Sequence, residues 1–304
     1  MKNIIILLLV LGFFACAPQS EDVKIENPVT PVEIKVESEG FADTLEIATW
    51  NIENFPLIAN NTISKLESII PQLDIDLYAV QEIADKDKFE YLMNKLEKYD
   101  GFLSSHTYSS GDYQKTGIIY KKEMVTIISS ESLFTDDTYA FPRPPLKLHL
   151  NTYKNGKNFD FYLIIIHLKA FGEQKDVDRR IAAALKLKNY LDEKTNNPNE
   201  TEKDYIIAGD WNDRIDEAPA NNAFQTFIDA PNSYKFLTTE LTGNPENASY
   251  PSLDEIIDHI LISKDSFSEY TGGSIKTLRL DDQISSYFST ISDHRPIMAI
   301  FPVF

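Results

Sequence analysis

Nine apolar, β-rich segments recur between residues 45 and 301, and those in the middle of the chain follow one another with no helical pattern between them. Strictly alternating strands and helices would build one parallel sheet, so this order predicts mixed sheets in an α/β domain. Apolar residues at helical spacing predict helices at 63–70, 89–96 and 181–191. No boundary interrupts residues 44–304, which we expect to form one domain. The nine segments are residues 45–50, 77–80, 117–120, 125–128, 146–150, 159–167, 205–208, 256–262 and 296–301.

The N-terminus has the pattern of an export signal. Lys2 is followed by uncharged residues from 4 to 15, a stretch too short to cross a bilayer core of about 30 Å but typical of a signal peptide. It ends in Phe14-Ala15-Cys16, which resembles a bacterial lipoprotein signal. The resemblance implies removal of residues 1–15 and acylation of Cys16, with a plain secretory signal as the alternative. We therefore expect an exported, membrane-anchored protein of the outer membrane, periplasm or cell surface.

Residues 16–43 are expected to be an acidic tether. Residues 17–43 contain seven acidic side chains, two basic ones and three prolines, so they offer little apolar surface to bury. Val32, Ile34 and Val36 alternate with charged residues, which leaves a short edge strand as the competing interpretation.

Charge and cysteine content exclude several classes of protein. The net charge of −18 argues against non-specific nucleic-acid binding, which clustered lysine and arginine usually supply. A single cysteine rules out an internal disulfide and a multi-cysteine zinc cluster. The sequence contains neither a G-x-G-x-x-G motif nor a Walker loop, so no nucleotide cofactor is expected.

Polar side chains capable of metal or phosphate chemistry stand at or beside the ends of six of the apolar segments. In α/β proteins the ends of separate strands converge on one crevice, where sites are built. Each residue alone is more often a solvated loop residue or a turn cap, but the set as a whole predicts a site. These strand ends are Trp50-Asn51, Val80-Gln81-Glu82, Ile166-His167, Gly209-Asp210-Trp211-Asn212, Ile257-Asp258 and Ser292-Asp293-His294.

Taken in order, these segments resemble the endonuclease/exonuclease/phosphatase superfamily, the deoxyribonuclease I-like proteins. The resemblance covers about residues 45–304. It implies a four-layer α/β/β/α sandwich, in which two packed mixed sheets are flanked by helices, and a divalent cation that assists hydrolysis of phosphoester bonds. The segments are Ala48-Thr49-Trp50-Asn51-Ile52, Gln81-Glu82, Gly209-Asp210-Trp211-Asn212, Ile257-Asp258-His259-Ile260-Leu261 and Ser292-Asp293-His294-Arg295-Pro296.

The resemblance implies a metal site formed by Glu82, with Asn51 assisting and Asp293 completing the coordination sphere. A carboxylate together with waters suits a hard cation, so we expect Mg²⁺, with Mn²⁺ or Ca²⁺ as alternatives. Asp210 and Asn212 are expected to orient the attacking water.

Two histidines are expected to take part in the chemistry. His294 and Asp258 suit a pair in which the carboxylate orients the imidazole. The imidazole then takes a proton from water or stabilises the transition state. His167 would donate to a non-bridging phosphate oxygen. His259 is expected to be structural, because on a strand its side chain points away from that of Asp258.

Two further residues are expected to contact phosphate. Arg143 stands among prolines before a strand, at a position comparable to a phosphate-binding arginine of the family, although a surface arginine in a proline turn is the plain alternative. Tyr113 precedes the strand at 117–120, close to a phosphate-contacting tyrosine of the relatives.

The substrate class rests on weaker signals. The helix after His167 contains the densest basic region of the chain, which favours a nuclease with nucleic acid as its substrate, although such a helix is usually a solvated face. The alternative is a phosphatase or phosphodiesterase for inositol phosphates, sphingomyelin-type lipids or other small phosphoesters. A non-catalytic binding lipoprotein is a third hypothesis, and a monomer is expected. The basic residues are Lys175, Arg179, Arg180, Lys186 and Lys188.

Overall fold

The structure is a computed structural model that describes residues 34–108, 111 and 113–304. The expected signal peptide, Cys16 and residues 17–33 of the expected tether lie outside the described residues. The compact unit spans Ile34–Phe304. Among the helices of the described part, none combines the length and the apolarity needed to cross a membrane.

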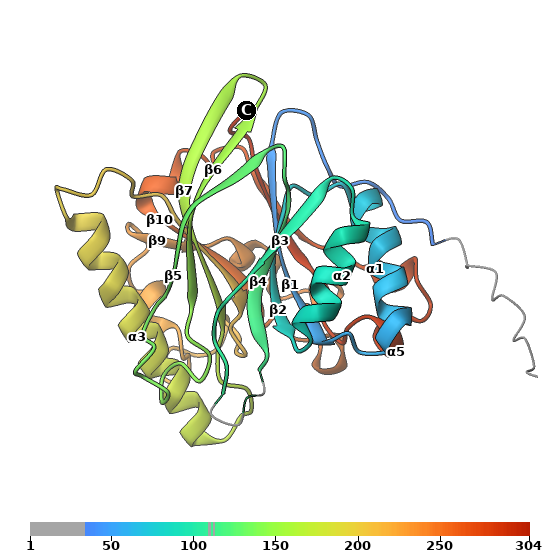
Figure 1. Ribbon diagram of the computed structural model, residues 1–304. Helices are drawn as coiled ribbons and strands as arrows, with labels where there is room; N and C mark the ends of the chain where they lie inside the picture. Colours follow the sequence, from blue (N-terminus) through green and yellow to red (C-terminus); the bar gives the residue numbers. More distant parts are fainter. Residues whose placement is uncertain (1–33, 109–110, 112) are drawn as a thin grey trace, which may run out of the picture. The chain divides into compact units, whose positions relative to one another are not determined.

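Two six-stranded mixed sheets form the centre of the domain (Figure 1). Each sheet contains one parallel pair of strands, β1 with β2 in the first and β7 with β8 in the second, and its other pairs are antiparallel. In spatial order the first sheet contains β11 (Ser274–Thr277), β12 (Ile297–Phe301), β1 (Leu45–Phe55), β2 (Leu77–Ile83), β4 (Lys115–Lys121) and β3 (Tyr99–Leu103). The second contains β5 (Val125–Ser132), β6 (Leu146–Lys154), β7 (Lys157–His167), β8 (Tyr205–Asp210), β10 (Asp258–Ser263) and β9 (Tyr234–Phe236).

Helices cover the outer faces of the two sheets. α1 (Ala59–Leu73) and α2 (Lys86–Lys95) lie against the first sheet, and the long α3 (Gln174–Asn196) lies against the second (Figure 1). The four-layer α/β/β/α sandwich expected from the sequence is therefore confirmed. The short helices are α4 (Gln225–Ile228), α5 (Tyr287–Thr290), η1 (Leu237–Leu241), η2 (Pro245–Asn247), η3 (Pro251–Leu253), η4 (Lys264–Phe267) and η5 (Leu280–Asp282).

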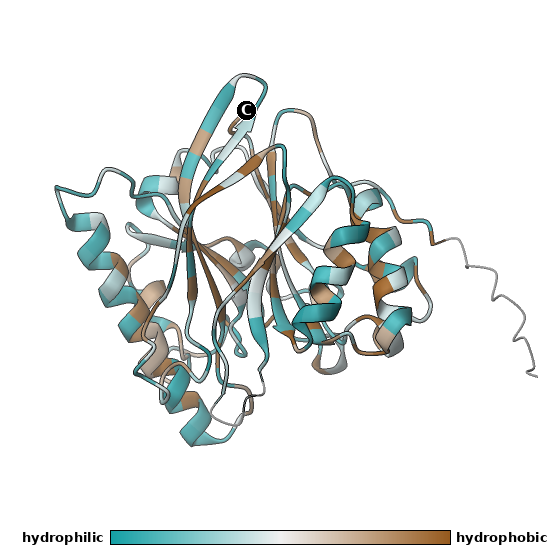
Figure 2. Ribbon diagram, viewed as in Figure 1, coloured by the Kyte–Doolittle hydropathy of each residue, from teal (hydrophilic) through white to brown (hydrophobic). Residues whose placement is uncertain are grey.

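The hydrophobic core has three layers, and the central strands contribute to two of them. On β7, Leu163 and Ile165 point into the layer between the sheets, whereas Ile164 and Ile166 point to the layer under α3. Successive side chains of a strand alternate between faces, so a strand covered on both sides must be apolar along its whole length. Figure 2 shows the result, with hydrophobic strands inside and a largely hydrophilic α3 outside.

All nine strands and all three helices expected from hydrophobic patterning are present, and three strands were missed. The missed strands β3, β9 and β11 are short, and each lies at an edge of its sheet. An edge strand has fewer neighbours to bury its side chains, so its sequence carries a weaker apolar pattern.

Residues 34–43, which the sequence analysis assigned to the tether, pack on the domain. Val36 is buried, its N–H donates to Gln72 Oε1 at 3.2 Å, and Glu39 N–H donates to Leu73 O at 2.8 Å. No strand forms between residues 34 and 43. The last residues before β1 are therefore bound to the end of α1.

Candidate active site

Three neighbouring strands of the second sheet present polar side chains at the same edge. His167 ends β7, Asp210 ends β8 and Asp258 begins β10. The strand register pairs His167 with Asp210 and Asp210 with Asp258. All three residues are buried. Residues separated by more than 40 positions in the chain therefore lie side by side because their strands are adjacent.

The first sheet completes this cluster from the other side. The Asn51 side-chain amide on β1 donates to Glu82 Oε1 on β2 at 3.2 Å and to Asp210 Oδ2 on β8 at 3.0 Å. Glu82 Oε2 also accepts a 2.9 Å hydrogen bond from Asn54 N–H. The site thus lies where the ends of the two sheets meet.

Irregular backbone directs two of these side chains. Glu82 has φ 60° and Asn212 has φ 56°, a left-handed conformation that is uncommon for residues other than glycine. The register between β2 and β4 shifts between Val80 and Ile83, so Glu82 lies within an irregularity of its strand. Such strained positions cluster at functional sites, and these two occur at strand ends that the sequence analysis selected.

The buried imidazole of His167 faces two carboxylates. His167 Nε2 lies 3.7 Å from Glu82 Oε1 and 3.5 Å from Asp210 Oδ2. Burial lowers the pKa of His167 well below its usual value, with the charges of Arg143 and His294 acting in the same direction. The ring is therefore neutral near pH 7.

Asp258 and His294 form the expected pair. Asp258 Oδ2 lies 2.8 Å from His294 Nδ1, and both side chains are buried. Burial by itself lowers the pKa of His294, but the charge and hydrogen bond of Asp258, together with Asp210 and Asp293, outweigh burial and raise this pKa to about 10. Burial and the charge of Asp258 raise the pKa of Asp210 to about 7. In the absence of a cation, His294 is thus the charged partner of Asp258.

Buried hydrogen bonds hold this pair in place. Tyr287 OH donates to His294 O at 2.6 Å and accepts from Trp50 Nε1 at 3.0 Å. Ser292 Oγ accepts from His294 N–H at 2.9 Å. Ser249 Oγ accepts from Asp258 N–H at 3.1 Å, and the ring of Tyr250 lies 5.0 Å from that of His294. The backbone around both residues is therefore fixed from several elements.

Asn212 and Asp293 lie at the margin of the cluster. Asp210 Oδ1 accepts a 2.9 Å hydrogen bond from Asn212 N–H, while the Asn212 side-chain amide donates to Leu168 O at 3.2 Å. Asp293 Oδ1 lies 3.8 Å from His294 Nε2, and Asp293 N–H donates to Glu53 Oε2 at 3.0 Å. Asn212 therefore lies beside Asp210, and Asp293, which was expected to complete the coordination sphere of the metal, lies beside His294.

The cluster fits a hard divalent cation. Ligand atoms of Asp210, Asp258 and His294 lie within 4.8 Å of one another. Asn51 Oδ1 and Asp258 Oδ1 are buried and have no hydrogen-bond partner among the described residues, although oxygens in such a position normally have one. Carboxylate and amide oxygens are the ligands that Mg²⁺, Mn²⁺ and Ca²⁺ prefer, and several acidic groups in one buried place need a positive counter-charge. Asn51 and Glu82, with Asp210 and Asp258 beside them, are the residues that could hold the ion.

Arg143 lies beside the cluster, behind His167. Its NH1 donates to Leu168 O at 3.3 Å and to His167 O at 3.5 Å, and its NH2 donates to Gln114 Oε1 at 2.7 Å. Gln114 in turn donates to Asn54 Oδ1 at 2.7 Å, which links Arg143 to the residue that contacts Glu82. The guanidinium group of Arg143 therefore lies within the site in which it was expected to contact phosphate.

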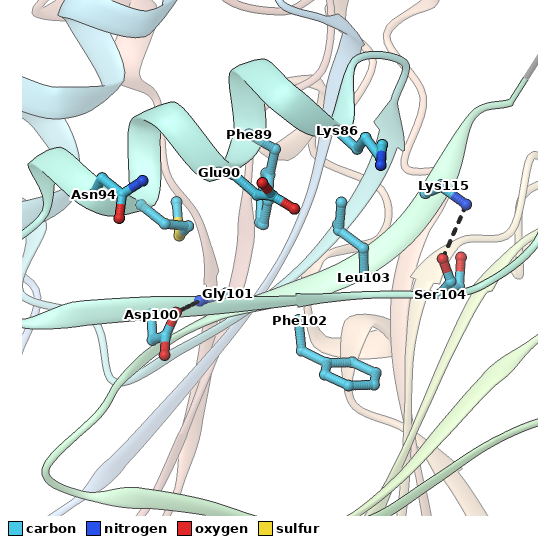
Figure 3. A pocket seen from close by; sticks show the side chains of 11 residues that line it. Lys86, Phe89, Glu90, Asn94, Asp100, Gly101, Phe102, Leu103, Ser104 and Lys115 are labelled. Atoms are coloured by element: carbon cyan, nitrogen blue, oxygen red, sulfur yellow. Dashed lines mark hydrogen bonds between the residues drawn. The ribbon is translucent and has the colours of Figure 1, made fainter.

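Tyr113 lies farther out, next to a cavity between α2 and β3. Tyr113 OH accepts a 3.1 Å hydrogen bond from Lys86 N–H, and Lys115 Nζ lies 4.6 Å from its ring centroid. Lys86 and Lys115 are also part of the wall of the cavity, which has a volume of about 560 Å³ (Figure 3). Among the described residues, no hydrogen bond joins Tyr113 to the cluster around Asp210. The structure therefore brings Arg143 to the cluster but not Tyr113.

Sequence reasoning missed several residues of this site. Glu53, Gln114 and Tyr250 contact site residues, yet none of them ends a strong apolar segment. Glu53 and Gln114 each stand within two residues of a selected position, which was the only available signal. His259 is structural as expected, since it is buried between Thr238 Oγ1 at 2.8 Å and Asp213 O at 3.0 Å.

The basic residues of α3 are largely engaged within the protein. Arg180 is buried against Asp213, with Nε and NH2 each 2.8 Å from Asp213 Oδ2. Arg179 donates to two backbone carbonyls. Among the described residues, the other ion pairs of α3 lysines are Lys175 with Glu173, Lys186 with Asp137, Lys188 with Asp192, and Lys194 with Glu200.

Comparison with solved structures supports the same fold. Human nocturnin with bound sulfate aligns with a TM-score of 0.61 at 17% identity, covering 86% of this chain and 95% of that one. D. rerio TDP2 with a single-strand DNA product aligns with a TM-score of 0.58 at 20% identity, covering 85% of this chain and 98% of that one. A mannosyl-6-phosphatase from Bacteroides thetaiotaomicron aligns with a TM-score of 0.57 at 16% identity, covering 84% of this chain and 98% of that one. At these identities the similarity establishes the fold alone.

Comparison at the level of sequence identifies the family. No curated protein matches the chain significantly. The sequence model of the Endonuclease/Exonuclease/phosphatase family matches residues 48–294, which is most of the domain and contains every residue of the cluster. The chain therefore belongs to the Endonuclease/Exonuclease/phosphatase family, whose members hydrolyse phosphoester bonds.

Proposed function

We propose that the domain is a divalent-metal-dependent phosphoesterase that hydrolyses phosphodiester bonds of nucleic acid. The observation that carries the proposal is the single buried cluster in which Asn51 joins Glu82 to Asp210, next to His167 and the Asp258–His294 pair. A cation, proton-transfer groups and phosphate-oxygen donors are what phosphoester hydrolysis requires.

Each side chain suits one part of the reaction. When bound, the cation would neutralise charge on the phosphate oxygens. Asp210, whose two oxygens accept from the Asn51 amide and from Asn212 N–H, is suited to orient the attacking water and accept its proton. The neutral His167 can donate from Nε2 to a non-bridging oxygen, and His294, held by Asp258, can donate to the charge that develops in the transition state.

Two observations bear on the substrate. A fold neighbour, D. rerio TDP2, was solved with a single-strand DNA product, which supports nucleic acid as the first choice. The second candidate is a small phosphoester. It is favoured by the net charge of −18, by the internal ion pairs of α3, and by the equally similar mannosyl-6-phosphatase.

A substrate panel separates these possibilities. The purified domain, supplied with Mg²⁺ or Mn²⁺, should cleave plasmid DNA, RNA or single-strand DNA and should stop when EDTA is added. His294→Ala should lower the rate about 10²-fold or more. His149→Ala, which alters a histidine on the β6–β7 surface, is the matched control. Turnover of sugar or inositol phosphates without cleavage of any nucleic acid would favour the second candidate, and turnover of neither would contradict both.

We also propose that the protein is exported and anchored through a lipid on Cys16, and that it acts as a monomer. The support is the resemblance of residues 1–16 to a lipoprotein signal. Labelled palmitate should be incorporated into the wild-type protein and not into Cys16→Ser, which should leave the membrane fraction. Equal labelling of the two proteins would contradict the anchor. Sedimentation of the purified domain checks the monomer.

A further inference from the structure

The loop that follows β7 presents an unusually exposed aromatic residue. Phe171 is 74% exposed, the highest value for a large hydrophobic side chain in the described part of the chain. Single exposed apolar residues are common on protein surfaces, so exposure alone indicates nothing. The position of Phe171 and the way its loop is held are what make it informative.

A buried guanidinium fixes the loop. Arg180 NH1 donates to Lys169 O and to Phe171 O, each at 2.7 Å, while its other nitrogens contact Asp213. Phe171 itself has φ 80°, in the left-handed region that a phenylalanine rarely adopts. Such a conformation persists only where the surroundings impose it. The ring is therefore presented to solvent by a well-anchored backbone.

The same loop begins inside the catalytic cluster. Leu168 O accepts hydrogen bonds from Arg143 NH1 at 3.3 Å and from Asn212 Nδ2 at 3.2 Å, and Leu168 directly follows His167. Phe171 is three positions after Leu168 in the chain, a span of about 11 Å at most between the two Cα atoms. The ring is thus presented by the loop that leaves the site directly after His167.

A cation accompanies the ring. Lys169 Nζ lies 4.3 Å from the Phe171 ring centroid, and its only ion pair among the described residues is with Asp176 at 3.4 Å. An aromatic face beside a positive charge is the arrangement on which proteins stack the bases of single-stranded nucleic acids, with the cation near the backbone. Gly172, Glu173 and Lys175 follow in the same loop and helix start, so the segment after Phe171 is small and charged rather than apolar.

We propose that Phe171 is a base-stacking subsite, which binds the nucleobase next to the scissile phosphate. The proposal rests on the proposed nuclease function and specifies it further. It predicts that the enzyme prefers a strand with bases over a bare sugar-phosphate backbone, and that this preference depends on the ring at position 171.

The test compares two single-stranded substrates of equal length, an oligothymidylate and a base-free deoxyribose-phosphate oligomer, with Mg²⁺. The readout is the ratio of kcat/KM for the first substrate to kcat/KM for the second. Because base stacking on an aromatic side chain is worth a few kcal/mol at most, Phe171→Ala should lower this ratio about tenfold. Phe171→Trp, which keeps an aromatic face, should retain it.

Phe41→Ala is the matched control. Phe41 is 51% exposed and lies at the other end of the sheets, where its carbonyl accepts from Lys154 Nζ at 2.7 Å. This variant should keep the wild-type ratio. An unchanged ratio in Phe171→Ala, with wild-type cleavage of both substrates, would overturn the stacking subsite alone. Failure of the wild-type protein to cleave either oligomer would instead overturn the nuclease function on which the subsite rests.

Discussion

The Asn51 side-chain amide donates a 3.0 Å hydrogen bond to Asp210 Oδ2, and this contact joins strand β1 of one sheet to strand β8 of the other. The same amide donates to Glu82, so one asparagine orients two carboxylates from different sheets. Its own oxygen is buried and has no hydrogen-bond partner within the described part of the chain, which leaves it available to a cation. The geometry of the site therefore depends on how the two sheets pack.

Replacing Asn51 with alanine should lower the rate of phosphoester hydrolysis about 10²-fold, as removal of one preorganised polar group from an active site does. It should also raise the Mg²⁺ concentration needed for half-maximal rate, because an amide oxygen is lost. Initial rates measured over a Mg²⁺ titration test both effects. Asn196→Ala, at an exposed position near the end of α3, is the control. A rate within threefold of wild type would show that Asn51 does not support the site.

Asp258→Asn should lower the pKa of His294 strongly, because the carboxylate that opposes the effect of burial is removed. The rate should fall about 10²-fold or more, since the imidazole loses its charged partner. NMR titration of the His294 ring in metal-free protein measures the pKa. Asp160→Asn removes the carboxylate partner of His149 on the surface and should leave the rate unchanged. A His294 pKa that stays near 10 in Asp258→Asn would contradict this account.

His259 should make the domain less stable in acid. Its ring is neutral in the folded state, where Nε2–H donates to Asp213 O and Nδ1 accepts from Thr238 OH, and burial lowers its pKa to about 4. Because the pKa of His259 is lower in the folded state, the neutral ring stabilises the fold at pH values above its pKa in the unfolded chain, which is near 6.5. This stabilisation is lost as the pH falls towards 4. Compared with His259→Gln, which does not titrate, the free energy of unfolding of the wild-type protein should fall by about 3 kcal/mol between pH 7 and pH 4.

Urea unfolding of both proteins at several pH values measures that loss. The comparison with His259→Gln is needed because other buried groups shift in the opposite direction, as when burial raises the pKa of Glu46 to about 8. A difference between the two proteins that is constant with pH would contradict the prediction.

Arg180→Met should destabilise the domain by about 3–5 kcal/mol, because it leaves Asp213 without its partner and frees the loop that contains Phe171. Lys188→Met, in an i,i+4 pair with Asp192 on the same helix, should cost about 0.5 kcal/mol. Denaturant unfolding of the two variants gives both values. If Arg180→Met and Lys188→Met lowered the free energy of unfolding by similar amounts, the Arg180–Asp213 pair would not anchor the loop.

Much of this architecture could be predicted from the sequence. Strands covered on both faces must be largely apolar, so β7 and β8 contain continuous apolar runs, residues 161–166 and 205–208. His167, Asp210 and Asp258 stand at the ends of such segments, and the resemblance of those ends to the endonuclease/exonuclease/phosphatase superfamily implied a phosphoesterase site. The short edge strands β3, β9 and β11 escaped because they bury less and carry a weaker pattern.

What the sequence could not determine is which side chains meet. Asn51 and Asp210 are 159 positions apart, and they touch only because β1 and β8 face each other across the central core. The packing of the sheets also leaves Tyr113 outside the cluster and adds Glu53 and Gln114 to it. It places Arg180 in a buried ion pair, although the sequence presented it as part of a basic surface. Local patterns record whether a residue is buried, whereas its partner is decided by the order and packing of the strands.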